Sequence, residues 1–303
     1  MRSVFSKTIL AAAQADPKVL LLTGDHGYAL FDEFRKAAPE QFINAGIAEQ
    51  NMVGVAAGLA KAGFKPIVYG LSAFVPIRVL EQIKMDVCYE NLPVVFIGDG
   101  AGLVYSSLGS SHQSTEDIAV LRPIPNISIL SPCDVYEMQY AMDEALRFKS
   151  PFYLRMGKSD IGDVHKSPVS VPVGDLVPVR TGQHNDILFL ATGSMVKTAI
   201  KLAETVNAAV WSVPGIKPVN HTQLNEIALH TKTVVTLEEH SIFGGLGSLV
   251  AETLGETGKT RVIRMGVQDR FSQKCGSYDY LLKEHGIDVA GLIPQLTSVL
   301  ASD

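Results

Sequence analysis

Short apolar runs alternate along the chain with longer segments whose hydrophobic positions recur at helical spacing. In the first half this pattern predicts strands over Val19–Thr23, Pro66–Tyr69, Pro93–Ile97, Ser128–Leu130 and Phe152–Arg155. It predicts helices over Ala48–Ala62 and Val75–Tyr89, and a third after Ser131, the expected N-cap, with Pro132 at the first helical position. Strands that alternate with helices are typical of a parallel sheet covered by helices.

The pattern breaks between Gly157 and about Asn185, where several prolines and glycines predict a surface linker. A second alternation then predicts strand Asp186–Ala191, helix Ser194–Val206, strands Ala209–Val213 and Thr233–Glu238, helix Gly245–Leu254 and strand Arg261–Met265. The expected fold class is α/β, with two domains of mainly parallel sheets flanked by helices. We expect these domains over residues 1–160 and 186–303, joined by a linker over 161–185.

Composition agrees with two domains, because 303 residues correspond to two units of about 150 residues. Charged residues make up only 19%, against roughly 25% in ordinary soluble proteins. Either a large surface lies hidden in a subunit interface, or the α/β cores are simply well filled, and the sequence leaves both open. The net charge of −5 provides no basic field, so nucleic acid is not an expected partner.

The cysteines and the apolar runs indicate where the chain resides. Cys88, Cys133 and Cys275 are widely spaced and form no CxxC pair, which favours a reducing compartment over a disulfide framework and predicts no metal site. The N-terminal segment lacks the apolar core of a signal peptide, and no apolar run reaches the roughly 20 residues that span a bilayer. We therefore expect a cytoplasmic protein without membrane contact.

The segment Phe42–Ala60, FINAGIAEQNMVGVAAGLA, carries the strongest chemical signal. It places one acid, Glu49, in the first turn of a helix whose residues from Met52 to Ala60 are small or apolar. Such a helix is buried on most sides. Judged on spacing alone, Glu49 either complements the helix dipole near its N-terminus or serves a reaction.

The stretch GIAEQNMVGVAAGLA resembles the pyrimidine-binding domain of transketolases and of 1-deoxyxylulose-5-phosphate synthases. The resemblance extends from about Arg2 to Gly286 and implies a role for Glu49. In those families the glutamate bonds N1′ of the aminopyrimidine of thiamine diphosphate, favours its imino tautomer and so promotes loss of the thiazolium C2 proton. The resemblance therefore implies that Glu49 is catalytic and binds the cofactor.

Two further segments carry the same resemblance. In YGLSAFVPIRVLEQI, Phe74 matches the aromatic residue that stacks on the aminopyrimidine, a geometry worth about 1 kcal/mol beyond area burial. Leu71 and Asp25 are placed at the cofactor in the same way. In GSSHQSTEDIAVLRPIPN, His112 matches a histidine that contacts hydroxyls of the donor sugar. Without the resemblance, Phe74 would be a core residue and His112 a solvated loop residue.

Gly98-Asp99-Gly100, followed by Asn126, has the spacing of the GDG…N motif that holds Mg²⁺ and diphosphate in thiamine enzymes. Asp and Asn are suitable oxygen ligands for a hard cation. These residues follow Glu49, however, where the resemblance aligns a substrate loop and a plain turn. We therefore interpret the match as chance and expect no metal ligand in this chain. The resemblance implies that the Mg²⁺ and diphosphate ligands come from a separate, N-terminal subunit.

The positions that clamp a sugar phosphate in transketolases are only partly kept. Arg2 and Arg155 match the two arginines of that clamp and are expected to bind substrate. Its serine and histidine positions hold Ala29 and Gly100, and Leu108 replaces an acid that reads a sugar hydroxyl. The donor and acceptor sugars therefore stay open, and a modified or differently charged sugar is possible.

The second half also resembles the family, through DILFLATGS, TLEEH with FGGLG, and GVQDRF. FGGLG has the appearance of a phosphate loop, but a lone glycine cluster is weak evidence, and the resemblance implies a domain without catalytic residues. We expect its glycines to permit a tight turn and close helix packing.

The resulting hypothesis is a transketolase-type transferase subunit that moves a two-carbon ketol unit from a ketose to an aldose. It would act with thiamine diphosphate and Mg²⁺ at a site shared with its partner, in a heterotetramer with two copies of each subunit. Three alternatives stay open: a 1-deoxyxylulose-5-phosphate synthase-like reaction, a 2-oxoacid dehydrogenase β-subunit, and a non-catalytic scaffold.

Overall fold

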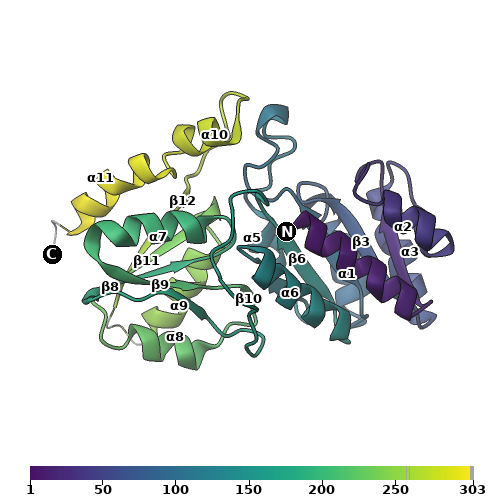
Figure 1. Ribbon diagram of the computed structural model, residues 1–303, viewed down its shortest axis with the longest axis horizontal. Helices are drawn as coiled ribbons and strands as arrows, with labels where there is room; N and C mark the ends of the chain where they lie inside the picture. The colour runs from purple at the N-terminus through teal and green to yellow at the C-terminus, as the bar shows by residue number, and fades with distance from the viewer. Residues whose placement is uncertain (257, 259, 301–303) are drawn as a thin grey trace.

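The computed structural model describes residues 1–256, 258 and 260–300, which form two α/β domains side by side (Figure 1). The first domain, purple to teal in the figure, contains a seven-stranded sheet. Its strand order is β10 (Gly215–Lys217), β5 (Ser128–Leu130), β6 (Phe152–Met156), β4 (Val95–Asp99), β3 (Lys65–Leu71), β1 (Val19–Thr23) and β2 (Phe42–Asn44). All neighbouring pairs are parallel except β10 with β5.

Helices cover both faces of the first sheet because consecutive strand residues face opposite sides. Leu21 of β1 packs with Phe5 and Ile9 of α1, whereas Leu20 and Leu22 face the opposite core. The described helices of this domain are α1 (Arg2–Ala15), α2 (Asp32–Ala37), α3 (Glu49–Lys61), α4 (Leu80–Gln82), α5 (Asp117–Leu121) and α6 (Val135–Arg147). Short 3₁₀ turns lie at Pro39–Gln41, Ile77–Val79 and Ser106–Leu108.

The second domain, green to yellow in Figure 1, has a five-stranded sheet. Its order is β12 (Arg261–Val267), β11 (Thr233–Ser241), β8 (His184–Ala191), β9 (Ala208–Ser212) and β7 (Val177–Arg180), with only β7 antiparallel. Its described helices are α7 (Met195–Val206), α8 (His221–Ala228), α9 (Leu246–Gly255), α10 (Tyr278–Glu284) and α11 (Val289–Leu300). The fold class predicted from the sequence is confirmed by this arrangement of two mainly parallel sheets.

Several local expectations need correction. The N-cap of α6 is Asp134, whose carboxylate accepts hydrogen bonds from the backbone of Tyr136 and Glu137, and not Ser131. The expected helix over Val75–Tyr89 is a succession of a 3₁₀ turn, α4 and a π-helical segment at Ile83–Cys88. Pro76 is the N-cap of the first of these turns, so the helical residues begin only at Ile77.

The expected linker is shorter than its assigned range. Val177–Arg180, within 161–185, pairs with β9 as β7, because its alternating residues fit the edge of the second sheet. The chain then crosses back, and β10 completes the edge of the first sheet. The two domains are therefore joined by sheet pairing as well as by covalent connection.

A buried polar network also joins the domains. Arg155, 1% exposed at the end of β6, pairs with Asp117 through Nε and Oδ2 at 2.8 Å, and donates through Nη2 to the Glu239 carbonyl of β11 at 2.8 Å. The Tyr153 hydroxyl donates to the same carboxylate at 2.8 Å and shares a hydrogen bond with Ser72 at 3.0 Å. A charge buried this deeply requires its partner.

Replacing Asp117 by Ala leaves the Arg155 guanidinium buried without its counter-charge, which costs about 3–5 kcal/mol in the free energy of unfolding. Urea denaturation measures this loss. Glu90→Ala is the matched control, because it removes the half-exposed Lys61–Glu90 pair and costs at most about 1 kcal/mol. Equal losses of unfolding free energy in the two variants would contradict the larger contribution assigned to the buried Arg155–Asp117 pair.

Candidate active site

Glu49 is the first residue of α3 and is only 5% exposed. It follows the turn after β2, and the apolar face of α3 packs through Met52, Val53 and Ala56 into the core. Arg78 Nη1 lies 3.1 Å from Glu49 Oε2 and forms an ion pair with it. The carboxylate is thus buried at a helix start with a cation beside it.

Phe74 lies in the turn after β3, next to the same arginine. The Arg78 guanidinium carbon is 4.0 Å from the Phe74 ring centroid, a cation–π contact. The His112 ring meets Phe74 edge-on, with 5.4 Å between ring centroids. The structure therefore brings three residues singled out in the sequence, Glu49, Phe74 and His112, to one place. Arg78 belongs to the same cluster, although its exposed position in a predicted helix carried no signal in the sequence.

The remaining expected cofactor residues lie at strand ends on the same edge of the sheet. Leu71 is the last residue of β3 and is 9% exposed, and Asp25 is exposed in the loop after β1. His26, which the sequence interpretation missed, lies close by: its Nε2 is 3.3 Å from the Tyr69 carbonyl oxygen. Burial lowers the pKa of His26 and keeps its ring neutral, despite the opposing charge of Glu49. In the sequence, only its position directly after Asp25 could have pointed to His26.

Arg2 forms an ion pair with an acid of its own domain. Its Nη2 lies 2.6 Å from Asp99 Oδ2 and its Nε 3.3 Å from Oδ1. The carboxylate also accepts hydrogen bonds from the hydroxyls of Tyr69 and Tyr105, at 2.8 and 2.9 Å. Arg2 therefore already has a counter-charge, and substrate binding by its half-exposed side chain stays a prediction.

Arg155 departs further from its expected role. Its side chain is 1% exposed and its guanidinium is committed to Asp117 and Glu239, so it cannot meet a sugar phosphate. The sequence could not reveal this, because Asp117 and Glu239 lie far away along the chain. Arg155 is a buried structural residue in this fold.

The other changed clamp positions have physical explanations. Gly100 has a φ of +70°, and a Cβ added there would lie 2.0 Å from the Tyr105 ring, so no histidine fits. Ala29 is exposed with a φ of 61°, and Leu108 is 52% exposed. Gly100, Ala29 and Leu108 therefore provide no polar side chain at the positions where a sugar clamp would need one.

Asp99 and Asn126 cannot share a metal ion. Asp99 ends β4, whereas Asn126 lies just before β5 begins and donates its amide to the Cys88 carbonyl at 2.9 Å. Since β4, β5 and β6 run parallel, the two residues lie at opposite edges of the sheet. The GDG…N spacing therefore does not bring these two side chains to one place.

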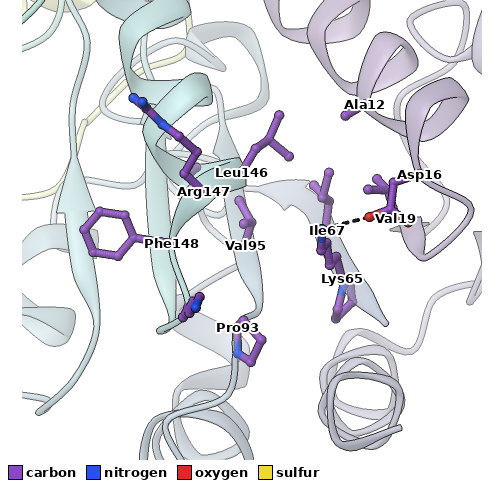
Figure 2. A pocket seen from close by; sticks show the side chains of 13 residues that line it. Ala12, Asp16, Val19, Lys65, Ile67, Pro93, Val95, Leu146, Arg147 and Phe148 are labelled. Carbon is purple, nitrogen blue, oxygen red and sulfur yellow. Dashed lines mark hydrogen bonds and ion pairs between the residues drawn. The ribbon is translucent and has the colours of Figure 1, made fainter. Parts of the chain in front are cut away.

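A cavity of about 310 Å³ lies at the edge opposite to Glu49 (Figure 2). Its lining includes Val19, Ile67 and Val95 near the amino ends of their strands, and the Lys65–Asp16 ion pair of 2.8 Å lies beside them. Parallel sheets bind ligands at the carboxyl ends of their strands. The cavity is accordingly separate from the candidate site.

The family models of the transketolase pyrimidine-binding domain and the transketolase C-terminal domain match residues 1–163 and 177–292. The chain belongs to the transketolase family. It is 34% identical to an apulose-4-phosphate transketolase subunit of Phocaeicola vulgatus over 96% of this chain and 94% of that protein. It is 32% identical to the 6-deoxy-6-sulfo-D-fructose transketolase subunit SqwH of Clostridium sp., over 97% and 92%.

Among solved structures, the chain is similar to a split-gene transketolase described as an inactive β4 tetramer. The TM-score is 0.88 with 32% identity, over 99% of this chain and 97% of that one. Both this structure and the two subunits named above match the chain over more than nine-tenths of their own length. The transketolase chain described here thus corresponds to the C-terminal section of a split enzyme.

Outside the site, Cys133, Glu137 and His165 place possible metal-donor atoms within 4.8 Å of one another. Glu137 Oε1 is 2.9 Å from His165 Nε2, and its Oε2 accepts from the Cys133 backbone at 2.8 Å. Asp134 Oδ2 also accepts from the His165 backbone, at 2.7 Å. Since both oxygens of Glu137 are already bonded, we assign this group a structural role, as a clasp between the linker and α6.

The clasp has a defined pH dependence. Burial alone lowers the pKa of His165, but the hydrogen bond and charge of Glu137 and the charge of Asp134 outweigh it and raise the pKa. The stabilisation is therefore complete below the unfolded pKa of about 6.5 and is lost as pH rises through the higher folded value. The stability difference between wild type and His165→Gln should be largest at about pH 6 and shrink as the pH rises through the folded pKa.

Chemical denaturation at a series of pH values measures that difference. His230→Gln is the control, because it removes an exposed imidazole in the turn that follows α8. A His165→Gln difference that grows with pH would mean that the imidazole is held neutral, and the clasp would be wrong as described.

Within the part of the chain that the structure describes, no helix is long and apolar enough to cross a membrane.

Proposed function

We propose that this chain is the C-terminal subunit of a split transketolase and transfers a two-carbon ketol unit using thiamine diphosphate at an inter-subunit site. The observation that carries the proposal is the cluster of a buried carboxylate at the start of α3, the Phe74 ring beside it and His112 at the edge of that ring. An aminopyrimidine needs both a carboxylate at its ring nitrogen and an aromatic face, and these residues fit it.

In this proposal Glu49 holds a proton between its carboxylate and N1′ of the aminopyrimidine, and Phe74 stacks on the ring. When bound, thiamine diphosphate supplies the nucleophilic carbon that accepts the two-carbon unit. Arg78 contacts both Glu49 and Phe74 and has to share or yield these contacts to the cofactor. Leu71 and Asp25 border the same edge of the sheet and would contact the cofactor there, while His112 would orient the hydroxyls of the donor sugar.

The diphosphate and its Mg²⁺ are proposed to be held by an N-terminal partner subunit. Asp99 and Asn126, the residues here with the matching spacing, lie at opposite sheet edges and do not hold a metal together. The relatives named above are subunits of split transketolases, which supports a partner of this kind.

The surface around Glu49 offers a place for partners. Asn51, Val55 and Gly58 are exposed at helical spacing along α3, and a Cβ added at Gly58 would meet nothing within 4 Å. Ile47, just before the helix, is 79% exposed, and Tyr28, in the loop after β1, is 83% exposed. This uncharged and largely apolar set favours a contact surface, consistent with a closed heterotetramer with two copies of each subunit. Of the two explanations for the low charge content, this supports the hidden interface.

The substrates are proposed to be anionic sugars other than the ordinary pentose phosphates. The relatives are named for apulose 4-phosphate and for 6-deoxy-6-sulfo-D-fructose. In this chain Arg155 is buried, Arg2 is paired with Asp99, and Gly100 leaves no room for a clamp histidine.

A cytoplasmic location is part of the proposal and agrees with the free thiols of Cys88, Cys133 and Cys275.

The alternatives are less well supported. A 1-deoxyxylulose-5-phosphate synthase-like reaction would use the same Glu49, Phe74 and His112, but the split-enzyme subunits match this chain almost end to end. The same matches favour a transketolase over a 2-oxoacid dehydrogenase β-subunit. A scaffold would gain nothing from a carboxylate buried at the start of α3, because removing a charge from water is costly even when Arg78 pairs with it.

Replacing Glu49 by Ala or Gln should lower kcat for ketol transfer in the two-subunit complex by about 10²–10⁴, because the proton at N1′ is then no longer held. Glu33→Ala, at an exposed position of α2, is the control and should retain wild-type activity. Steady-state assays with apulose 4-phosphate and 6-deoxy-6-sulfo-D-fructose as donor probes measure the effect. Full activity of Glu49→Ala would leave only the scaffold hypothesis.

A further inference from the structure

The loop that carries His112 is held in part by its own domain. The backbone of Ser114 pairs with that of Gly102 through hydrogen bonds of 2.7 and 3.0 Å. The Ser114 hydroxyl shares a hydrogen bond of 2.9 Å with Ser72, which lies two residues before Phe74. These contacts fix the C-terminal side of the loop relative to the Phe74 turn.

The second domain holds the side chain next to His112. Ser272, in the segment between β12 and α10, donates from its hydroxyl to Gln113 Oε1 at 2.7 Å. Ser110 donates to the Ser272 carbonyl at 3.4 Å, and the Gly276 backbone donates to the Ser106 carbonyl at 3.3 Å. Figure 1 shows α10 close to this loop, at the top of the boundary between the domains.

A histidine completes the contact from within the second domain. His285 Nε2 lies 2.9 Å from the Ser272 hydroxyl, and His285 is 6% exposed. Since that hydroxyl has one hydrogen and gives it to Gln113, it must accept from His285, so Nε2 carries the ring proton. Burial, with the nearby charge of Arg270, lowers the pKa of His285 and keeps the ring neutral despite Glu284.

The two hydrogen bonds are donated in one direction, from His285 to Ser272 and from Ser272 to the Gln113 amide oxygen. Gln113 is 7% exposed, and its amide nitrogen has no hydrogen-bond partner among the described residues. The Ser272 hydroxyl is therefore the side-chain contact through which the described structure orients this amide. Because His112 and Gln113 are adjacent in sequence, a fixed Gln113 restrains the backbone that carries the His112 ring.

We propose that Ser272 and His285 are positioning residues for the sugar-binding loop, so that the C-terminal domain sets the affinity for the donor ketose without touching the cofactor. This rests on the function proposed above, in which His112 orients the donor. It gives the second domain a part in substrate recognition, although the printed side-chain contacts of Glu49 and Phe74 among the described residues come from the first domain.

Ser272→Ala, Ser272→Thr and His285→Gln test the proposal in the purified two-subunit complex. Ser272→Ala removes the hydrogen bond to Gln113 and should raise KM for the donor probe that the wild type turns over by about tenfold. The kcat and the Kd for thiamine diphosphate should stay within about twofold, because Glu49 and Phe74 are untouched. Ser272→Thr keeps the hydroxyl and should restore KM to the wild-type value. The KM of His285→Gln should lie between those of the wild type and Ser272→Ala.

Thr253→Val is the matched control. Thr253 is buried in the same domain and its hydroxyl is 3.0 Å from His221 Nδ1, so this variant also removes a hydroxyl–imidazole contact, but away from the loop. It should lower stability to a similar extent without raising KM. An unchanged KM in Ser272→Ala, or an equal rise in Thr253→Val, would overturn the positioning role.

Amide hydrogen exchange gives a second readout that does not depend on turnover. Residues 109–116 should exchange faster in Ser272→Ala than in Thr253→Val, and equal protection would overturn the proposal. If the wild-type complex transfers no ketol unit from either donor, the proposed function fails, while the exchange comparison still decides whether Ser272 holds the loop.

Discussion

The ion pair between Arg155 and Asp117 is the contact around which the two domains and the site loops are arranged. Both side chains are at most 1% exposed, and the network around them reaches Glu239 of β11 and, through Tyr153, Ser72. Ser72 in turn contacts Ser114 of the His112 loop. A buried charge confines its neighbours to geometries that keep it paired, which ties the Phe74 turn, the His112 loop and the second domain to one another.

Strand β11 carries other buried titratable groups next to the Arg155 contact. Burial raises the pKa of Glu238 to about 7, although its carboxylate accepts from the backbone of Leu246 and Gly247 at the start of α9. Glu239 accepts from the Leu103 backbone and from the hydroxyls of Ser194 and Tyr278. The domain boundary is therefore held by hydrogen bonds that require correct side-chain placement, and its glycines serve packing: a Cβ at Gly245 would lie 1.9 Å from Glu238.

The sequence predicted those features whose information is local. Strands β1 and β5 agree with their predicted ranges, because their apolar runs are short and bounded. Glu49, Phe74 and His112 each lie within a motif of the sequence, and the structure brings them together. The separation of Asp99 and Asn126 to opposite edges of the sheet follows from the parallel strand order, which their spacing in the sequence does not reveal. The burial of Arg155 and the pairing of Arg2 could not be predicted, because their partners lie 38 and 97 residues away in sequence. Arg78, Ser272 and His285 were missed because a single polar residue in a loop or helix has no pattern.

The return of the chain into the first sheet has a consequence for how this molecule can be divided. Strand β10 belongs to the sequence of the second domain but covers the edge of β5 in the first. Cutting the chain in its linker would uncover that edge, and open sheet edges recruit other strands. The two halves are therefore poor units for recombination, and a module transplanted into another enzyme would have to carry β10 with the first domain or supply a substitute strand.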